Sequence, residues 1–246
     1  MTLIRQTDKP VGESRRTLLR AAVAGGALAT GGLLLGAAPA SAAHRTAPPR
    51  PRPTTPSAAL RELAAGNRRW RTFHQQHPHE SGAVREALVG GQHPFAVILG
   101  CIDSRVPPEL IFDQGLGDLM TVRAAGEVLD EAVLGSVAYG VLELGTPLVM
   151  VLGHQACGAV SAAVRAEETG EELPAHIQYI ADRIRPAIDH SQQGEARIDS
   201  TIDRNVAMVT RRLAEEPDLA ARIATGALAV VGARYELTSQ RVHTLT

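Results

Sequence analysis

Short, continuous runs of apolar residues recur along the chain and are separated by longer segments of mixed polarity. Runs of this kind, bounded by proline, glycine or polar residues, are typical of strands that are buried on both faces of a parallel sheet. A weaker run at the end of the chain predicts an additional edge strand over 241–246. The buried strands are expected at 95–99, 119–123, 148–152 and 227–231.

Between these runs, apolar residues recur at intervals of three and four, which predicts amphipathic helices. The first helix is expected from Ser57, a residue type that caps helices, to Phe73. Further helices are expected to start at Pro107–Pro108 and to cover 82–89, 128–144, 157–168, 174–189 and 198–215. Strands that alternate with helices predict an α/β fold, doubly wound, with a mainly parallel sheet of four to five strands covered by helices.

The first 42 residues have the pattern of an export signal. Arg15 and Arg16 precede an apolar run rich in glycine and alanine over 21–38, and small residues follow it, as in secretory signals. The paired arginines resemble a twin-arginine signal, and we expect cleavage after Ala42. A retained membrane anchor is the alternative, since the run is long enough to span a bilayer.

A proline-rich segment separates this signal from the rest of the chain. Its composition predicts a flexible or extended tether over 43–56, and the folded domain is expected at 57–246. We therefore expect an exported protein on the secreted, periplasmic or cell-wall side, with no stable membrane insertion after cleavage.

Composition and charge narrow the possible functions. The 246 residues carry a formal net charge of -1 at pH 7, so no basic excess favours a nucleic-acid partner. The chain has two cysteines, Cys101 and Cys157. They allow one disulfide, two buried thiols or two metal ligands. A thiol redox protein is disfavoured, because no Cys-x-x-Cys motif occurs.

Cys101 and His154 each follow a predicted buried strand directly, after Gly100 and Gly153. Ligands of open parallel sheets bind beyond the carboxyl ends of the strands, so the two side chains are expected to meet there. A glycine before each allows a sharp turn and a close approach of the backbone. Cys157 is expected in the first turn of the next helix, where a thiolate is stabilised.

Two thiolates and one imidazole form a set that binds catalytic zinc and leaves a fourth position for water. Each cysteine alone has a simpler interpretation, as a buried apolar residue or as half of a Cys101–Cys157 disulfide. Asp103 and Arg105 follow at alternate positions and can form a charge-assisted pair on the same side as Cys101. The alternative is that Asp103 or Ser104 caps the helix that starts at Pro107.

The two motifs together resemble the signature of the β-class carbonic anhydrases. The first is Cys-x-Asp-Ser-Arg over 101–105, and the second is Gly-His-x-x-Cys-Gly over 153–158. The segments 107–118, 122–126 and 133–137 are also similar to that family. The resemblance covers roughly 57–246 and omits the signal and the tether.

The resemblance implies one zinc per subunit, bound by Cys101, His154 and Cys157, with Asp103 and Arg105 as a catalytic dyad. It further implies that Asp103 can become the fourth zinc ligand in a closed, inactive form. The implied reaction is the reversible hydration of CO2 to bicarbonate and a proton by zinc-bound hydroxide. The family also implies a homodimer or homotetramer, in which the helix over 57–73 packs across the partner subunit.

One residue departs from the family pattern, and two other functions stay open. Many members carry asparagine or histidine where this chain has Glu127, so an additional carboxylate is expected near the site. A zinc-binding paralogue without activity would keep the fold but lose Asp103 or Arg105, and both are present. Hydrolysis of a CO2 analogue, CS2 or COS, on the same fold is the second alternative.

Overall fold

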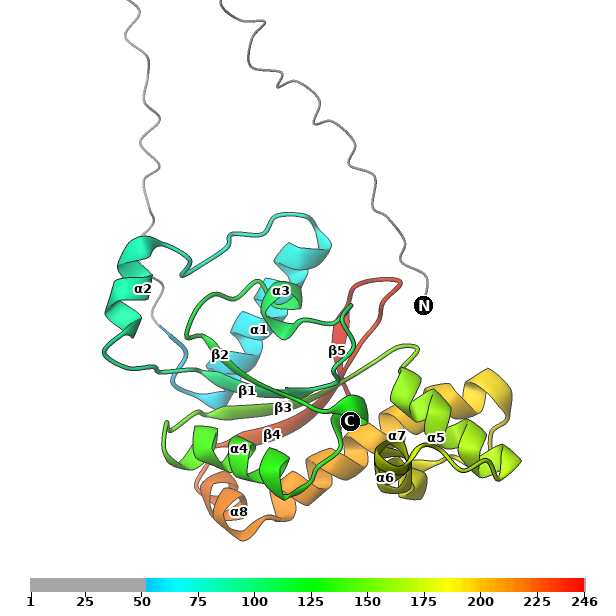
Figure 1. The fold of residues 1–246 in the computed structure, drawn as a ribbon. Coiled ribbons are helices and arrows are strands. Elements are labelled where there is room, and N and C mark those ends of the chain that lie inside the picture. The colour runs from blue at the N-terminus through cyan, green and yellow to red at the C-terminus, as the bar shows by residue number, and fades with distance from the viewer. Residues whose placement is uncertain (1–51, 246) are drawn as a thin grey trace, which may run out of the picture. The chain divides into compact units, whose positions relative to one another are not determined.

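The computed structural model describes residues 52–245, and a five-stranded sheet runs through its centre (Figure 1). The sheet has the order β2-β1-β3-β4-β5, in which the first four strands are parallel and β5 is antiparallel to β4. The strands are β1 (Ala96–Gly100), β2 (Leu119–Arg123), β3 (Leu148–His154), β4 (Ala229–Tyr235) and β5 (Val242–Leu245). The expected doubly wound, mainly parallel sheet of four to five strands is confirmed.

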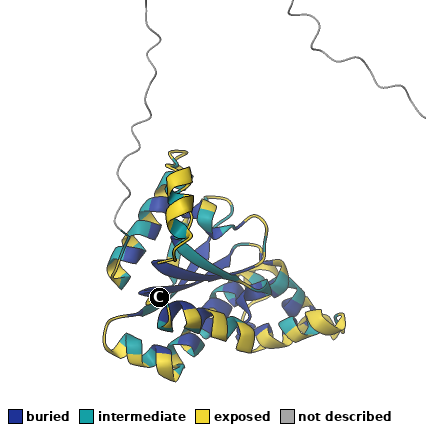
Figure 2. Cartoon of the chain, turned by 60° about the vertical axis from the view of Figure 1, so that its left-hand side comes forward, coloured by how far each residue is buried: buried dark blue, intermediate teal, exposed yellow. Residues whose placement is uncertain are grey.

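Helices cover both faces of this sheet, as Figures 1 and 2 show. Single 3-10 turns lie at Ala125–Glu127 (η1) and Arg185–Ala187 (η2). The α-helices are α1 (Pro56–Arg71), α2 (Gly82–Leu88), α3 (Pro108–Ile111), α4 (Glu131–Leu142), α5 (Gly158–Thr169), α6 (Ala175–Ile184), α7 (Gly194–Glu215) and α8 (Pro217–Ala224). Among the described residues, no helix is both long and apolar enough to cross a bilayer.

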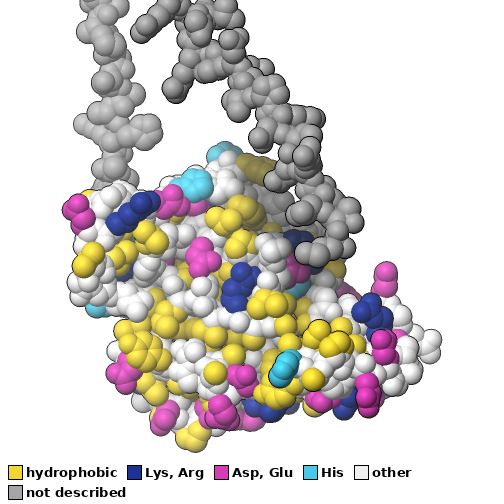
Figure 3. All heavy atoms as spheres, in the orientation of Figure 1, with side chains coloured by type: hydrophobic (Ala, Val, Ile, Leu, Met, Phe, Trp, Pro, Cys, Tyr) yellow, Lys and Arg dark blue, Asp and Glu magenta, His cyan; other side chains and the backbone are white. Residues whose placement is uncertain are grey.

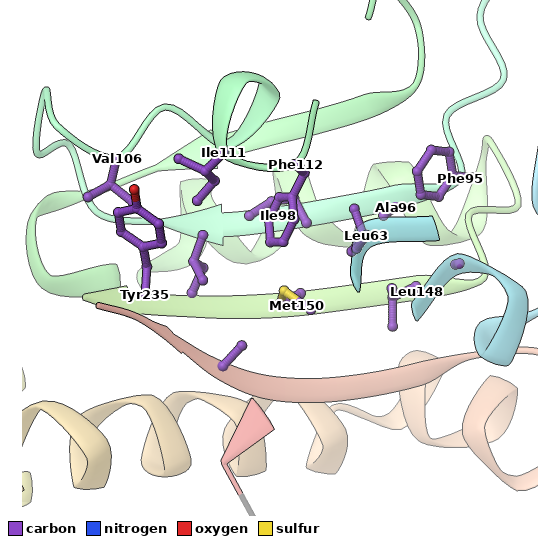
Figure 4. Close-up of a cluster of buried hydrophobic side chains, with 13 residues drawn as sticks. Leu63, Phe95, Ala96, Ile98, Val106, Ile111, Phe112, Leu148, Met150 and Tyr235 are labelled. Carbon is purple, nitrogen blue, oxygen red and sulfur yellow. The ribbon is translucent and has the colours of Figure 1, made fainter. Parts of the chain in front are cut away.

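One face of the sheet packs against α1 and α3 (Figure 4). Ile98 and Met150 point to this face and meet Leu63 of α1 and Phe112, which follows α3. All four side chains are almost completely shielded from solvent. Burial of side chains of this size contributes about 1.5–3 kcal/mol each, which explains why the strands are apolar throughout.

The other face packs against α4, α7 and α8. Val97 and Val151, whose neighbours along their strands face α1, point to this side and contact the apolar faces of these helices. A third cluster surrounds Cys101 and Cys157 and joins them to apolar residues of α5 and α6. The helices α5 and α6 therefore cover the carboxyl end of the sheet next to the two cysteines.

The element boundaries differ from the sequence expectations in a few places. The first helix begins at Pro56, because Thr55 rather than Ser57 caps it through a hydrogen bond from Ala58. The helix expected at 198–215 begins earlier, at Gly194, and α8 was not predicted at all. Proline at the first position of α8 starts that helix directly after the preceding one ends.

The expected signal over 1–42 and the tether up to residue 51 lie outside the described residues. Of the remaining tether positions, Arg52 contacts the domain, since its Nε lies 3.1 Å from a carboxylate oxygen of the buried Asp118.

Gly66 is expected to be essential for the packing of α1. A Cβ atom at this position would lie 1.7 Å from the carbonyl oxygen of Phe112, and both backbones would have to move. We expect Gly66→Ala to lower the free energy of unfolding by about 1–3 kcal/mol. Urea denaturation measures this change.

Gly82→Ala is the matched control, because a Cβ there meets nothing within 4 Å. Alanine favours a helix over glycine, so this variant should be unchanged or stabilised by up to about 1 kcal/mol. Equal stabilities of the two variants would show that the close contact between α1 and the backbone at Phe112 does not matter.

Candidate metal centre

Three potential metal ligands meet at the carboxyl edge of the sheet. Cys101 follows β1 directly, and His154 is the last residue of β3, the strand that pairs with β1. Cys157 occupies the N-cap position of α5. The strand order reverses at β1. The chain first adds β2 on one side of β1 and then crosses over to add β3 on the other side. This is the switch point at which open α/β sheets bind ligands.

The ligand atoms of these residues form a compact, buried group. They all lie within 4.8 Å of one another, and the two Sγ atoms are 3.9 Å apart. Both cysteines are free thiols, so the Cys101–Cys157 disulfide weighed as an alternative is absent. The sulfur separation fits a metal, because two zinc–sulfur bonds of about 2.3 Å at the tetrahedral angle place the sulfurs about 3.8 Å apart.

The imidazole of His154 is oriented to supply one nitrogen to this group. Its Nδ1 donates a hydrogen bond to the carbonyl of Gln155 at 2.9 Å, so Nε2 carries the lone pair. Nε2 is buried and has no hydrogen-bond partner among the described residues. An unpartnered buried nitrogen is costly unless it binds something. A metal ion between the three side chains removes that cost.

The protonation of the group also favours a cation. The contacts with Cys157 and His154 lower the pKa of Cys101, whereas the contact with Cys101 and burial raise the pKa of Cys157. Burial lowers the pKa of His154, but its contacts with Cys101 and Gln155 outweigh burial and raise it. The two sulfurs thus compete for one proton. A divalent cation replaces that proton and allows both thiolates to form.

Asp103 and Arg105 lie beside this group and form a bidentate pair. Arg105 donates from Nε to Oδ1 at 2.9 Å and from Nη2 to Oδ2 at 2.7 Å. These bonds hold the pKa of Asp103 at about 2, so its carboxylate is charged at neutral pH. Oδ2 is 3.9 Å from Nε2 of His154. Asp103 does not belong to the compact ligand group, and its oxygens are held by Arg105.

Arg105 also joins the two turns that carry the ligands. Its Nη2 donates to the carbonyl of Ala156 at 3.3 Å, across from the Cys101 turn. Ala156 adopts a left-handed backbone with φ of 54°, an uncommon conformation for a residue with a side chain. The alternative role of Asp103 or Ser104 as a helix cap is wrong, because Pro107 is the N-cap residue of α3 and no side chain caps it.

The glycines before Cys101 and His154 do not make the expected sharp turn. Neither has a positive φ, and a Cβ at Gly100 would meet only an ordinary contact at 3.8 Å. A Cβ at Gly153 would lie 2.5 Å from a methyl group of Val206 on α7. Gly153 therefore allows α7 to pack closely against β3, next to His154.

Arg123, the last residue of β2, contacts the centre but was not among the predicted site residues. Its Nε donates to the carbonyl of Cys101 at 2.8 Å, and its Nη2 donates to the carbonyl of Asp103 at 2.7 Å. A signal was present, because Arg123 ends a predicted parallel strand at the same edge of the sheet as Cys101 and His154.

Glu127, the residue that departs from the family pattern, is buried next to the centre. Its Oε2 is 3.5 Å from the amide nitrogen of Asn205 on α7, and its Oε1 has no hydrogen-bond partner within residues 52–245. Burial, and then the charge at Cys101, raise the pKa of Glu127 well above its usual value. The neighbouring Gly126 donates its N–H to Sγ of Cys101 at 3.4 Å.

Comparison with known proteins identifies this arrangement. A family model described as carbonic anhydrase matches residues 96–242, which include every residue of the centre. Carbonic anhydrase 2 of Mycobacterium tuberculosis is 44% identical over 190 residues, which cover 76% of this chain and 92% of the relative.

Two solved structures are similar in fold. A β-carbonic anhydrase of Aspergillus fumigatus aligns with a TM-score of 0.62 and 25% identity, over 77% of this chain and 89% of that one. A structure described as one of two tetrameric β-carbonic anhydrases of Sordaria macrospora aligns with a TM-score of 0.62 and 21% identity, over 76% and 96% of the chains. With a matching family model, a close relative and a shared fold, the chain belongs to the carbonic anhydrase family, in its β class.

Proposed function

We propose that the chain catalyses the reversible hydration of CO2 to bicarbonate and a proton at one zinc per subunit. The observation that carries the proposal is the buried group of Cys101, His154 and Cys157, with the charged Asp103 beside it. Three protein ligands leave a fourth position on a tetrahedral metal, which is the mark of a catalytic rather than a structural site.

Zinc in such a site polarises water, so that hydroxide is available as a nucleophile near neutral pH. Zinc suits the donors, since two thiolates select it over magnesium or calcium. The protein supplies the rest through its own residues. The helix that begins after Cys157 directs its positive end toward that sulfur. The N–H of Gly126 stabilises Cys101 as a thiolate.

Asp103 and Arg105 act as an orienting pair in this proposal. Asp103 is ionised and can only accept hydrogen bonds, so it fixes the direction of the attacking water by accepting a hydrogen bond from its O–H group. Arg105 holds both carboxylate oxygens and keeps them away from the metal ligands. Asp103 could become a fourth metal ligand only if Arg105 released its carboxylate.

Two alternatives fit the structure less well. A non-catalytic zinc protein has no use for a bidentate Asp103–Arg105 pair beside the ligands, whereas a catalytic site requires it. Hydrolysis of CS2 or COS would use the same residues, but the curated relative with 44% identity is named a carbonic anhydrase.

The dyad and the ligands can be separated by mutation. We expect Arg105→Ala to bind as much zinc as the wild type but to lose at least about 100-fold in CO2 hydration, because Asp103 is no longer oriented. Cys157→Ser should lose both zinc and activity. Stopped-flow hydration assays with elemental analysis of the same preparations measure both quantities.

Several outcomes would contradict the proposal. Near wild-type turnover by Arg105→Ala would show that the Asp103–Arg105 pair does not orient the attacking water. Wild-type protein that carries zinc but hydrates no CO2 would favour the non-catalytic alternative, and turnover of CS2 or COS by that protein would favour the second.

We propose further that the subunits assemble as a homodimer or homotetramer. The solved β-carbonic anhydrases from Sordaria macrospora are described as tetrameric. In this chain β2 is an edge strand, and large apolar side chains are exposed, among them Ile102, Leu110 and Tyr139. Figure 3 shows hydrophobic side chains across the middle of one face, with charged side chains mainly along its lower and right-hand margins. Exposed edges and apolar patches are features of association surfaces.

Sedimentation equilibrium of the purified domain tests the assembly. A mass of two or four subunits is expected, and a monomer at all accessible concentrations would contradict it.

We propose finally that residues 1–42 direct export through the twin-arginine route, to the secreted, periplasmic or cell-wall side. The physical reason lies in the two thiols of the centre. A chain exported unfolded would meet an oxidising compartment with Cys101 and Cys157 free to cross-link. Folding first, in the reducing cytoplasm, lets both sulfurs bind metal before export.

Replacement of Arg15 and Arg16 by lysine tests this route. We expect the variant to accumulate inside the cell as folded, zinc-loaded enzyme, whereas the wild type is found outside with free cysteines. Fractionation with thiol labelling measures both properties. Normal export of the variant would refute the route, and a Cys101–Cys157 disulfide in the exported wild type would refute its chemical reason.

A further inference from the structure

We propose that Arg123 is a positioning residue that fixes the main chain of the catalytic turn over 101–105. This inference rests on the proposed function and deepens it, because it concerns how Asp103 is held for the reaction. Among the described residues, no hydrogen bond of Arg123 goes to a metal ligand atom or to the carboxylate of Asp103. It acts through two backbone carbonyls.

The contacts of Arg123 span the turn between a metal ligand and the orienting carboxylate. One guanidinium donates to the carbonyl of Cys101 at 2.8 Å and to the carbonyl of Asp103 at 2.7 Å. Charge-assisted bonds of this length are roughly twice as strong as neutral ones. The spacing between Cys101 and Asp103 along the backbone is therefore set by a rigid, planar group.

The turn needs such support because it belongs to no helix or strand. Ile102 is 60% exposed and Ser104 is also exposed, so side-chain packing holds little of the segment after the buried Cys101. Its internal bonds run from the N–H of Arg105 to Oδ1 of Asp103 and from the N–H of Val106 to the carbonyl of Asp103. The first bond lies within the turn, the second joins it to the next residue, and neither ties it to the sheet.

Arg123 provides that tie because of its place in the sheet. It ends β2, opposite Gly100 in β1, and the next residue donates its N–H to the carbonyl of Gly100 at 3.1 Å. The main chain of Arg123 is therefore fixed by strand pairing. Its side chain extends from this fixed point to the turn that follows β1.

Two arginines thus hold Asp103 from opposite ends. Arg105 binds its carboxylate, and Arg123 binds its main-chain carbonyl. A displacement of about 1 Å at a reacting group can lower a rate about 100-fold. The effect of losing Arg123 should therefore fall on turnover, since the ligand atoms themselves are held by β1, β3 and α5.

The test compares Arg123→Ala and Arg123→Lys with Arg197→Ala as the matched control. Arg197 also donates to a backbone carbonyl, that of Gln192 at 2.7 Å, and to a carboxylate, that of Glu168. Glu168 lies near the far end of α5, about 16 Å along the helix from Cys157. The control removes similar bonds at a distance from the centre.

We expect Arg123→Ala to lower kcat for CO2 hydration about 10- to 100-fold, with little change in KM. Arg123→Lys should be intermediate, because an ammonium cannot present two parallel donors in a plane. Zinc content should equal that of the wild type in both variants. Arg197→Ala should keep wild-type kcat.

Two readouts separate positioning from a general structural role. Added methylguanidine should restore part of the kcat of Arg123→Ala but not change that of Arg123→Lys or the wild type. Hydrogen exchange followed by mass spectrometry should show faster exchange confined to the peptide that contains 101–106, where the N–H of Val106 is held by Asp103.

The proposal is overturned if Arg123→Ala keeps kcat within about twofold of the wild type, well below the change expected for two charge-assisted bonds. It is also overturned if the variant loses zinc or global stability together with activity, or if methylguanidine fails to restore turnover. Wild-type protein in the same assay separates these results from a failure of the proposed function, because an inactive wild type would refute that function instead.

Discussion

The parallel pairing of β1 with β3 is the constraint on which the metal centre depends. It places the ends of two strands side by side, so Cys101 and His154 meet although more than fifty positions separate them in the sequence. The pairing is stabilised by apolar side chains on both faces of the sheet, packed against α1 and α3 on one side and α4, α7 and α8 on the other. The chemistry is thus carried by short turns attached to the most deeply buried part of the molecule.

The turns themselves are held by polar contacts. Arg105 connects the Cys101 turn to the backbone before Cys157, and Arg123 connects it to β2. Both guanidinium groups are exposed, while the ligands they surround are buried. This division keeps fixed positive charges near the centre without burying them, which would be costly. Neither guanidinium occupies the ligand atoms, and Nε2 of His154 has no hydrogen-bond partner among the described residues.

The sequence was sufficient to predict the parts of the fold that depend on local pattern. Continuous apolar runs identified the four parallel strands, and the residues after β1 and β3 identified the group of Cys101, His154 and Cys157. Contacts between distant segments were not predictable in this way. The two bonds from Arg123 require β2 to lie beside β1, and the contact between Glu127 and Asn205 joins residues that are 78 positions apart. The reason for Gly153 likewise became visible only with Val206 of α7 in place.

The proposed function requires that two sulfurs and one imidazole nitrogen bind a catalytic zinc at this switch point. X-ray absorption at the zinc edge of the purified enzyme tests the claim most directly. Two zinc–sulfur distances of about 2.3 Å are expected, together with one nitrogen and one further light atom at about 2.0–2.2 Å. A spectrum with only nitrogen and oxygen neighbours, or with a single sulfur, would contradict it.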